Sequence, residues 1–288
     1  MTEPRHDDEP ADPGHRDGGL VRLRLDLAYD GAGFSGWARQ PGRRTVQSEV
    51  EQALARVLRV DAALTVAGRT DSGVHALGQV AHLDVPEAVW SGLGATLLRR
   101  LAGVLPDDVR VTAVGPAPLS FHARYGALWR RYAYRVTDAR YGAMPLRRTD
   151  TLAWPRDLDV ARMARASALL LGERDFAAYC RRRERATSVR VLERFAWSRD
   201  ADGVLTATVQ ADAFCHQMVR SLVGAVLAVG DGRQDESWPV SLLARTVRAD
   251  RVIVAPAHAL TLLAVGYPAE DDLAARAART QGRRSPAY

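Results

Sequence analysis

The residues best suited to chemistry in this chain lie in the stretch from Ala67 to Ala76. It reads Ala-Gly-Arg-Thr-Asp-Ser-Gly-Val-His-Ala and sets a carboxylate, Asp71, two positions after an arginine, Arg69. The two glycines favour a tight turn, because glycine adopts backbone angles that other residues resist. Apolar runs on either side predict two flanking strands. A loop held by two strands is typical of a rigid scaffold that presents reactive groups to a large ligand.

The charge of the chain indicates a polyanionic partner. The 288 residues are 47% hydrophobic, enough for a sizeable core, and their formal net charge is +6. All forty basic residues are arginine, which a GC-rich genome would explain. Whatever its origin, arginine suits phosphate recognition and base stacking better than lysine, because its guanidinium is a planar fork of donors.

The cysteine count and the hydropathy pattern predict an intracellular protein. Cys180 and Cys215 are too few for a disulfide framework and lack metal-ligand spacing, so we expect packed thiols in a reducing cytoplasm. No apolar run approaches the roughly 20 residues of a membrane span. The acidic N-terminus does not resemble a signal peptide.

The order of expected elements predicts an α+β fold in two similar halves. Residues 1–19 are almost wholly polar and should be disordered, and residues 269–288 form a C-terminal tail. The first half, 20–117, is expected to hold strands at 21–27, 64–67, 79–85 and 109–114, with helices at 46–57 and 94–102, the first of them capped by Thr45. The second half, 118–268, is expected to hold strands at 129–137, 189–198, 204–211 and 260–265, with helices at 160–171 and 217–229. This order is typical of split βαβ units. Asp200-Ala201-Asp202-Gly203 predicts a hairpin between the strands at 189–198 and 204–211.

Separated segments of the chain resemble one family, the tRNA pseudouridine synthase A family. Together these segments span residues 21 to 268, nearly all of the chain that we expect to be ordered. They are Tyr29-Asp30-Gly31 with Phe34, Gly36 and Trp37; Gln40-Pro41 with Thr45-Val46-Gln47; Gly68 to Ala76 with Gly78-Gln79-Val80; Phe121-His122-Ala123-Arg124 with Arg131-Tyr132-Ala133-Tyr134; Met218 to Gly224; and Pro256-Ala257 with Leu260 and Tyr267.

The resemblance implies a fold and a reaction. The family folds as two ferredoxin-like (RRM-like) halves, with mixed, mainly antiparallel sheets flanking a central cleft. It isomerises uridine to pseudouridine at the thirty-eighth to fortieth nucleotides of tRNA, in the anticodon arm. It works as a homodimer and needs no cofactor and no metal. The chain departs from the family's usual residues at Ala38, Arg174 and residues 211–215. These departures bear on RNA docking, because none of them lies in the catalytic loop, Gly68 to Ala76.

The resemblance also assigns the catalytic residues. Asp71 is the essential carboxylate; the sequence leaves open whether it attacks the sugar, attacks the base or assists a glycal route. Arg220 is its ion-pair partner, and it lies in an otherwise apolar helix where an unpaired charge would be costly. Arg69 fills the space that the flipped base leaves or clamps a phosphate. Tyr132 is the platform on which the uracil stacks.

Arginine pairs are candidate contacts to the RNA backbone, although each of them could also be an ordinary solvated surface. We expect Arg43, Arg44, Arg130 and Arg131 to bind substrate. Other pairs are Arg99-Arg100, Arg147-Arg148 and the run Arg181-Arg182-Arg183. His75 and His82 have no third ligand in sight, so we expect His75 to stabilise the loop and expect no metal site.

Two other functions remain open from the sequence. A non-catalytic RNA-binding protein could keep both halves, and in it Asp71 would only cap a turn, since Asp-Ser-Gly is an ordinary turn tripeptide. Pure binding would not require the intact loop, however. A relative that modifies another uridine or another RNA is the second alternative.

Overall fold

The alternation of apolar and charged residues in β1 (Leu20–Tyr29) sets the first half of the fold. Leu23, Leu25 and Leu27 are fully buried, and the arginines between them point to the other face, because successive strand residues face opposite sides. β1 pairs antiparallel with β3 (His75–Pro86) and β4 (Val109–Ala117). Its leucines pack in one core with α1 (Val46–Leu58) and α2 (Glu87–Val104). The computed structural model describes residues 19–181 and 187–282.

The second half repeats this plan with different elements. β5 (Trp129–Thr137), β9 (Leu205–Ala211), β8 (Val189–Arg199) and β7 (Gly172–Asp175) pair antiparallel in that order. The helices are α3 (Val160–Ala168), α4 (Met218–Gly230) and the short α5 (Trp238–Ser241). Gly203, with φ of +80°, closes the turn between β8 and β9, which confirms the predicted hairpin.

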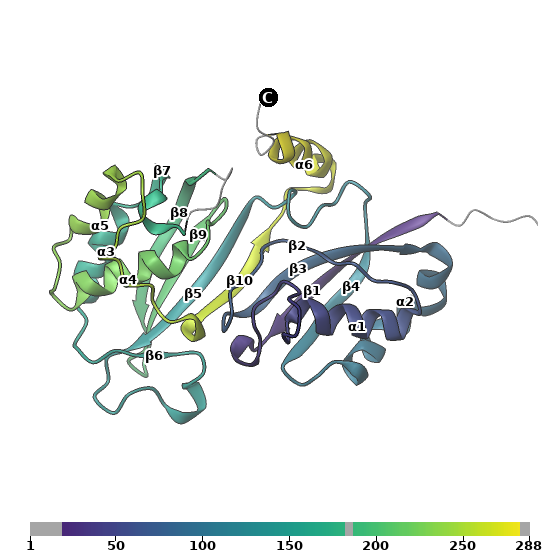
Figure 1. The fold of residues 1–288 in the computed structure, drawn as a ribbon, viewed down its shortest axis with the longest axis horizontal. Coiled ribbons are helices and arrows are strands. Elements are labelled where there is room, and N and C mark those ends of the chain that lie inside the picture. Colours follow the sequence, from purple (N-terminus) through teal and green to yellow (C-terminus); the bar gives the residue numbers. More distant parts are fainter. Residues whose placement is uncertain (1–18, 182–186, 283–288) are drawn as a thin grey trace, which may run out of the picture.

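The last strand of the second half joins the two halves into one sheet. β10 (Leu260–Gly266) runs antiparallel to β5 on one side and parallel to β3 on the other. The order across the ten-stranded sheet is β4-β1-β3-β10-β5-β9-β8-β7, while β2 (Thr65–Val66) pairs with β3 and β6 (Leu152–Ala153) with β5. Figure 1 shows the two lobes side by side along this sheet, with β10 between them. The loop after β2 therefore lies where the halves meet.

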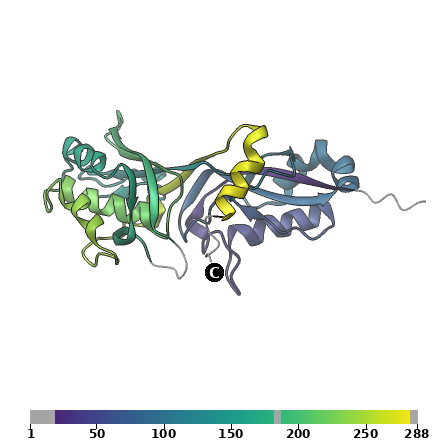
Figure 2. The ribbon, with the colours of Figure 1, turned by 90° about the horizontal axis from the view of Figure 1, so that it is seen from above.

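A terminal helix covers this junction. α6 (Leu273–Gly282) crosses the middle of the molecule in Figure 2, between the two lobes. Its Leu273 packs in a small second core with Ala67, Val80 and Phe121. The same segment that carries the catalytic loop is thus packed against both the main core and the α6 side of the sheet.

The predicted elements compare closely with the observed ones. α1 begins after Thr45, whose hydroxyl accepts a hydrogen bond from the Ser48 amide, so the predicted cap is confirmed. α2 begins at Glu87, earlier than predicted, because β3 leads into it without a loop. No helix in the described ranges is long and apolar enough to cross a membrane. The predicted N-terminal tail, residues 1–19, lies almost wholly outside the described residues. The predicted C-terminal tail, residues 269–288, is described as far as residue 282 and contains α6. The domain boundaries at 117 and 268 stay predictions.

The expectation of two packed thiols is wrong. Cys180 and Cys215 are joined in a disulfide, with their Cα atoms 5.7 Å apart. The two cysteines are 35 residues apart in sequence. Their backbone segments are also joined by a hydrogen bond, in which the Arg181 amide donates to the His216 carbonyl at 3.0 Å. Linear spacing could not reveal this contact, because the β8–β9 hairpin creates it.

Candidate active site

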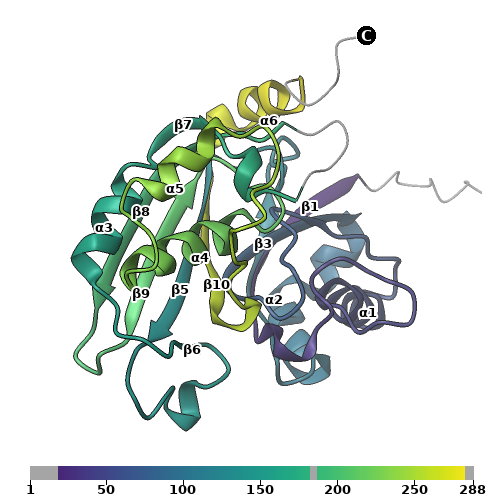
Figure 3. The ribbon, with the colours of Figure 1, turned by 60° about the vertical axis from the view of Figure 1, so that its left-hand side comes forward.

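A cleft lies between the two halves, and its volume is about 400 Å³. Residues 67–71 after β2 form one wall, and residues 213–220 before and within α4 form the other. Figure 3 shows α4 between α3 and the N-terminal half, in front of β5 and β10. The structure thus brings the predicted catalytic loop and the predicted late helix together across one cleft.

A buried hydrogen-bond network holds the catalytic loop in place. The hydroxyls of Tyr29 and Thr70 lie 2.9 Å apart, and the fully buried Gln79 donates to the Tyr29 hydroxyl and to the Gly68 carbonyl. Burial raises the pKa of Tyr29 to about 12, so this phenol stays protonated. Gly36 backs the loop closely, because a Cβ there would lie 3.0 Å from the Thr70 carbonyl oxygen. The loop is therefore rigid before any ligand arrives.

Asp71 points into the cleft between two donors. Its Oδ2 lies 3.7 Å from Nη1 of Arg220, and its Oδ1 lies 3.3 Å from Nε2 of His216. The Asp71 side chain is 30% exposed, so part of the carboxylate remains open to a ligand. A carboxylate held in this way is aimed into the cleft, as nucleophilic or proton-transfer chemistry requires.

Arg220 is fixed from the second half. Its Nε donates to the Ala255 carbonyl at 2.6 Å, and the Ala255 amide donates back to the Arg220 carbonyl. α4 reaches this segment because residue 224 is glycine: a Cβ there would collide with the Ile253 carbonyl. Burial lowers the pKa of Arg220, and the negative charge of Asp71 opposes that shift. The guanidinium remains a cation, since arginine is not deprotonated in proteins.

Tyr132 forms part of the floor of the cleft. It is 8% exposed and lines the cleft from β5. Phe214 meets its ring edge-on, with ring centroids 5.3 Å apart and planes at 85°. Burial raises the pKa of Tyr132, so its hydroxyl is protonated at neutral pH. The ring can therefore offer an aromatic surface and a hydrogen-bond donor to a base in the cleft.

Arg69 stands on the rim of the same cleft. Its side chain is exposed, and within residues 19–181 and 187–282 its guanidinium has no hydrogen-bond or ion-pair partner. This position leaves Arg69 available to a ligand, in contrast to Arg220.

The other substrate-binding candidates lie in different settings. Arg130 is 7% exposed and donates to the carbonyls of Ala67, Arg124 and Asp212, so it ties the catalytic loop to the second half. Arg131 points to the opposite side of β5, where it contacts Gln210 and stacks on Trp129. The contacts of Arg130 and Arg131 to phosphate stay predictions. The present contacts of both side chains, which are to other protein groups, do not favour them.

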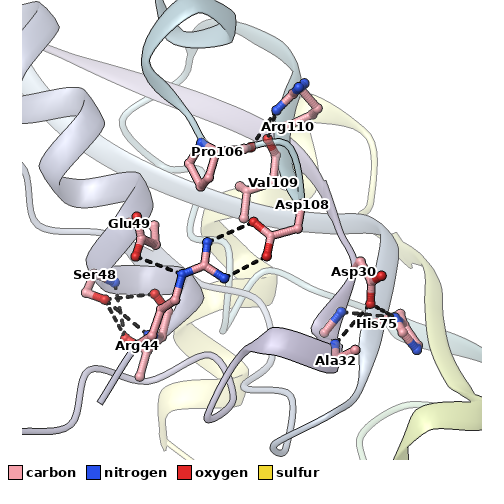
Figure 4. A network of polar contacts seen from close by, with 12 residues as sticks. Asp30, Ala32, Arg44, Ser48, Glu49, His75, Pro106, Asp108, Val109 and Arg110 are labelled. Atoms are coloured by element: carbon pink, nitrogen blue, oxygen red, sulfur yellow. Dashed lines mark hydrogen bonds and ion pairs between the residues drawn. The ribbon is translucent and has the colours of Figure 1, made fainter. Parts of the chain in front are cut away.

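The first arginine pair is divided between solvent and a salt-bridge network. Arg44 donates to both oxygens of Asp108 at 2.6 and 2.9 Å and contacts Glu49 (Figure 4). Its guanidinium also lies over the ring of Phe34. These carboxylate bonds raise the pKa of Arg44. Arg43 is exposed beside it. The phosphate contacts of Arg43 and Arg44 stay predictions. Of the run Arg181-Arg182-Arg183, residues 182 and 183 lie outside the described residues.

His75 supports the structure at the far end of the loop. Its Nδ1 accepts from the Gly31 amide at 3.0 Å, and its Nε2 faces the carbonyls of Thr149 and His258. Asp30 lies beside the same ring (Figure 4). These contacts fit the predicted loop-stabilising role. In the part of the chain that the structure describes, no group of three or more His, Cys, Asp or Glu residues could hold a metal ion.

Sequence reasoning missed two residues of the cleft, Phe214 and His216. Both lie in the segment before α4 and line the cleft. The one available signal was their proximity in sequence to Arg220, because residues just before a helix N-terminus share the surroundings of its first turn. Nothing in the spacing indicated that His216 meets Asp71.

The chain is similar to known proteins over most of its length. A model of the family described as tRNA pseudouridine synthase matches residues 27–126 and 166–268. The tRNA pseudouridine synthase A of Frankia casuarinae is 62% identical over 269 residues, covering 93% of this chain and 97% of that protein. The same-named protein of Streptomyces griseus subsp. griseus is 59% identical over 270 residues, with 93% and 95% covered. That of Streptomyces avermitilis is 55% identical over 273 residues, with 93% and 95% covered.

These matches confirm the resemblance on which the fold and the reaction class were predicted. They cover both walls of the cleft, from the catalytic loop to α4. The chain belongs to the tRNA pseudouridine synthase family, whose members are isomerases that convert uridine to pseudouridine in tRNA.

Proposed function

We propose that this chain isomerises uridine to pseudouridine at the thirty-eighth to fortieth nucleotides of the tRNA anticodon arm, with Asp71 as the essential carboxylate. The observation that carries the proposal is the placement of Asp71 between Arg220 and His216, in a cleft that Tyr132 also lines. A carboxylate that only capped a turn would not need a half-buried cation from the other half of the molecule.

The reaction needs a positioned carboxylate and no redox partner. The bond from ribose C1′ to uracil N1 breaks, the base rotates, and a bond from C1′ to C5 forms. The proton on C5 goes to solvent and N1 gains a proton, so atoms and charge balance without an added reagent. Asp71 acts at the sugar–base bond by attack on the sugar, attack on the ring or assistance to a glycal route. No cofactor and no metal take part.

Base flipping gives Arg69 and Tyr132 their roles. A uridine stacked in an RNA helix hides its glycosidic bond, so the enzyme extrudes it into a pocket. Arg69, exposed on the rim, fills the vacated space in the RNA or clamps a phosphate beside it. Tyr132 stacks on the extruded uracil, because its ring lies in the floor of the cleft. The net charge of +6 supports the grip on the RNA backbone.

The remaining parts of the proposal rest on the family. We place the reaction in the cytoplasm, where tRNA is matured, and we expect the chain to act as a homodimer. The arginine side chains Arg43, Arg44, Arg130 and Arg131 are the candidate contacts to the RNA outside the cleft. Of these, the exposed Arg43 is the best placed to meet a phosphate.

A tritium-release assay tests the proposal. Unmodified tRNA labelled with tritium at uracil C5 is incubated with the wild-type protein and with Asp71→Asn, which keeps the shape of the side chain but removes its charge. We expect release by the wild type and none above background by Asp71→Asn, with equal tRNA binding. Mapping of pseudouridine in the product then identifies the modified nucleotides.

Each failure has a distinct meaning. Binding of tRNA without tritium release by the wild type would leave a non-catalytic RNA-binding protein. Release with the modification mapped outside the anticodon arm would make the chain a relative with another target. Full activity of Asp71→Asn would remove the assignment of the carboxylate.

A further inference from the structure

We propose that His216 is a positioning residue that holds Asp71 in its reactive orientation. This inference rests on the proposed function, because it concerns the same carboxylate. The two oxygens of Asp71 face different partners: Oδ2 faces Arg220 and Oδ1 faces Nε2 of His216. The histidine side chain is 21% exposed and lines the same cleft as Asp71 and Arg220.

Arg220 alone does not fix the carboxylate. Its Nη1 lies 3.7 Å from Oδ2, beyond hydrogen-bond distance, while its Nε is already bound to the Ala255 carbonyl. A single long contact leaves the carboxylate free to rotate about its bond to the β-carbon. A donor on the second oxygen removes this freedom, because the two oxygens are then held from opposite sides.

His216 stands on a segment whose backbone is held at several points. The Asp212 carboxylate accepts from the amides of Val191 and Ala213 at 2.9 and 2.8 Å. Cys215 is joined to Cys180, and the His216 carbonyl accepts from the Arg181 amide. Such anchoring is what a residue needs in order to orient another group, since a mobile donor would follow the carboxylate.

The turn into α4 adds a further constraint next to His216. Gln217 has φ of +66°, a left-handed conformation that non-glycine residues adopt only where the surroundings impose it. Its side-chain oxygen accepts from Nη1 of Arg248 at 2.9 Å. The residue directly after His216 is therefore held in an uncommon backbone conformation.

The separation of 3.3 Å between Nε2 and Oδ1 lies just beyond the usual N–H···O range of about 2.7 to 3.2 Å. Catalytic hydrogen bonds are often long in a free enzyme and tighten when substrate is bound. A neutral imidazole with its proton on Nε2 is sufficient for this role, because donation and not charge fixes the carboxylate.

A pair of variants of similar length tests the role. His216→Gln keeps an N–H group close to the position of Nε2, whereas His216→Leu fills similar space without a donor. The measurements are the single-turnover rate constant for tritium release at saturating enzyme, the Kd for tRNA by filter binding, and the thermal midpoint of each variant.

We expect His216→Leu to lower the rate constant by roughly 10- to 100-fold, as a displaced catalytic group does. We expect His216→Gln to stay within about five-fold of the wild type. Both variants should bind tRNA within about two-fold of the wild type, because the proposed role of His216 is to hold Asp71. Rescue by Gln separates positioning from a general disturbance of the segment, which would slow both variants alike.

The inference is overturned if His216→Leu keeps its rate within two-fold, if Gln is as slow as Leu at an unchanged thermal midpoint, or if only the Kd changes. If His216→Leu does not fold, the rate of His216→Gln decides, since a fall of more than ten-fold with a normal thermal midpoint excludes simple donation. Absence of tritium release by the wild type is a different result, because it removes the proposed function itself.

Discussion

Arg220 and Asp71 come from opposite halves of the molecule, yet Nη1 of Arg220 lies 3.7 Å from Oδ2 of Asp71. The carboxylate belongs to the loop after β2, and the arginine belongs to the first turn of α4. The pair forms because β10 joins the sheets of the two halves, which sets α4 against the catalytic loop. The candidate active site is thus a property of the junction between the halves.

Replacement of Arg220 by lysine should impair the reaction without preventing folding. A lysine ammonium can reach either the Ala255 carbonyl or the Asp71 carboxylate, whereas the arginine fork reaches both. We expect Arg220→Lys to lower the rate constant for tritium release by roughly 10- to 100-fold with little change in tRNA binding. Arg220→Met should be slower still. Equal rates for the wild type and Arg220→Lys would show that simultaneous contact with Ala255 and Asp71 is not required.

Tyr132 should act mainly through its ring. Base–aromatic stacking contributes about 1 to 3 kcal/mol per base, so Tyr132→Leu should lower the rate constant by roughly 10- to 100-fold. Tyr132→Phe keeps the ring and its edge contact with Phe214, and should stay within about ten-fold of the wild type. Because burial raises the pKa of the phenol, it cannot serve as a phenolate at neutral pH. Equal losses in the two variants would instead assign the main role to the hydroxyl.

Arg69 and Arg44 form a matched pair for testing RNA contact. Arg69 is exposed on the rim of the cleft, whereas Arg44 is engaged by Asp108 and Glu49. We expect Arg69→Ala to reduce the rate constant or tRNA affinity at least ten-fold, as loss of a contact to the nucleic acid does. We expect Arg44→Ala to lower stability by about 1 kcal/mol and to leave tRNA binding within two-fold.

Two measurements test the predictions for Arg69→Ala and Arg44→Ala. Denaturant unfolding measures the stability of Arg44→Ala, and filter binding at several salt concentrations measures the affinity of both variants. A weaker salt dependence in Arg44→Ala would show that this arginine leaves Asp108 to contact phosphate, as the sequence alone suggested.

His82 should make the fold sensitive to mild acid. Burial lowers the pKa of His82 to about 4 from its ordinary value of 6.5, and its Nδ1 accepts a hydrogen bond from the Ala123 amide. Between these two pH values the unfolded chain binds a proton that the folded chain does not. Stability should therefore fall as pH drops from about 6.5 to about 4, and His82 should have no effect above that window.

His82→Asn is the matched variant, because its side-chain oxygen can accept from the same amide but does not titrate. Denaturant unfolding of both proteins at pH 7 and pH 4.5 measures the effect. We expect the wild type to lose more stability than His82→Asn, by on the order of 2 kcal/mol. Parallel losses in the two proteins would assign the acid sensitivity to other groups, such as His122, whose ring lies 5.0 Å from that of His82 and whose pKa burial also lowers.

Local patterns in the sequence were sufficient for most of the elements. The alternation in β1, the threonine cap of α1 and the Asp-Gly turn between β8 and β9 each act within a few residues, so each was readable without a fold. The family resemblance carried further, because its motifs identified the catalytic loop, Tyr132 and Arg220 as parts of one site before any distance was known.

Tertiary structure decided which arginines can meet a ligand. Arg69, Arg44 and Arg130 look alike in the sequence, but one is exposed on the cleft, one is engaged by Asp108, and one is buried against three carbonyls. A charged side chain takes its role from the partners around it, and these come from distant segments. Neighbouring sequence positions do not encode such partners.

The sequence by itself determined most of the elements, the family and the carboxylate that we propose as essential, because these depend on local periodicity and on contiguous motifs. Only the tertiary structure placed His216 beside Asp71 and joined Cys180 to Cys215. Both contacts arise where β9, α4 and the catalytic loop converge through the sheet. The physical reason is that a sheet brings residues together across strands, so its contacts follow pairing order and not order along the chain.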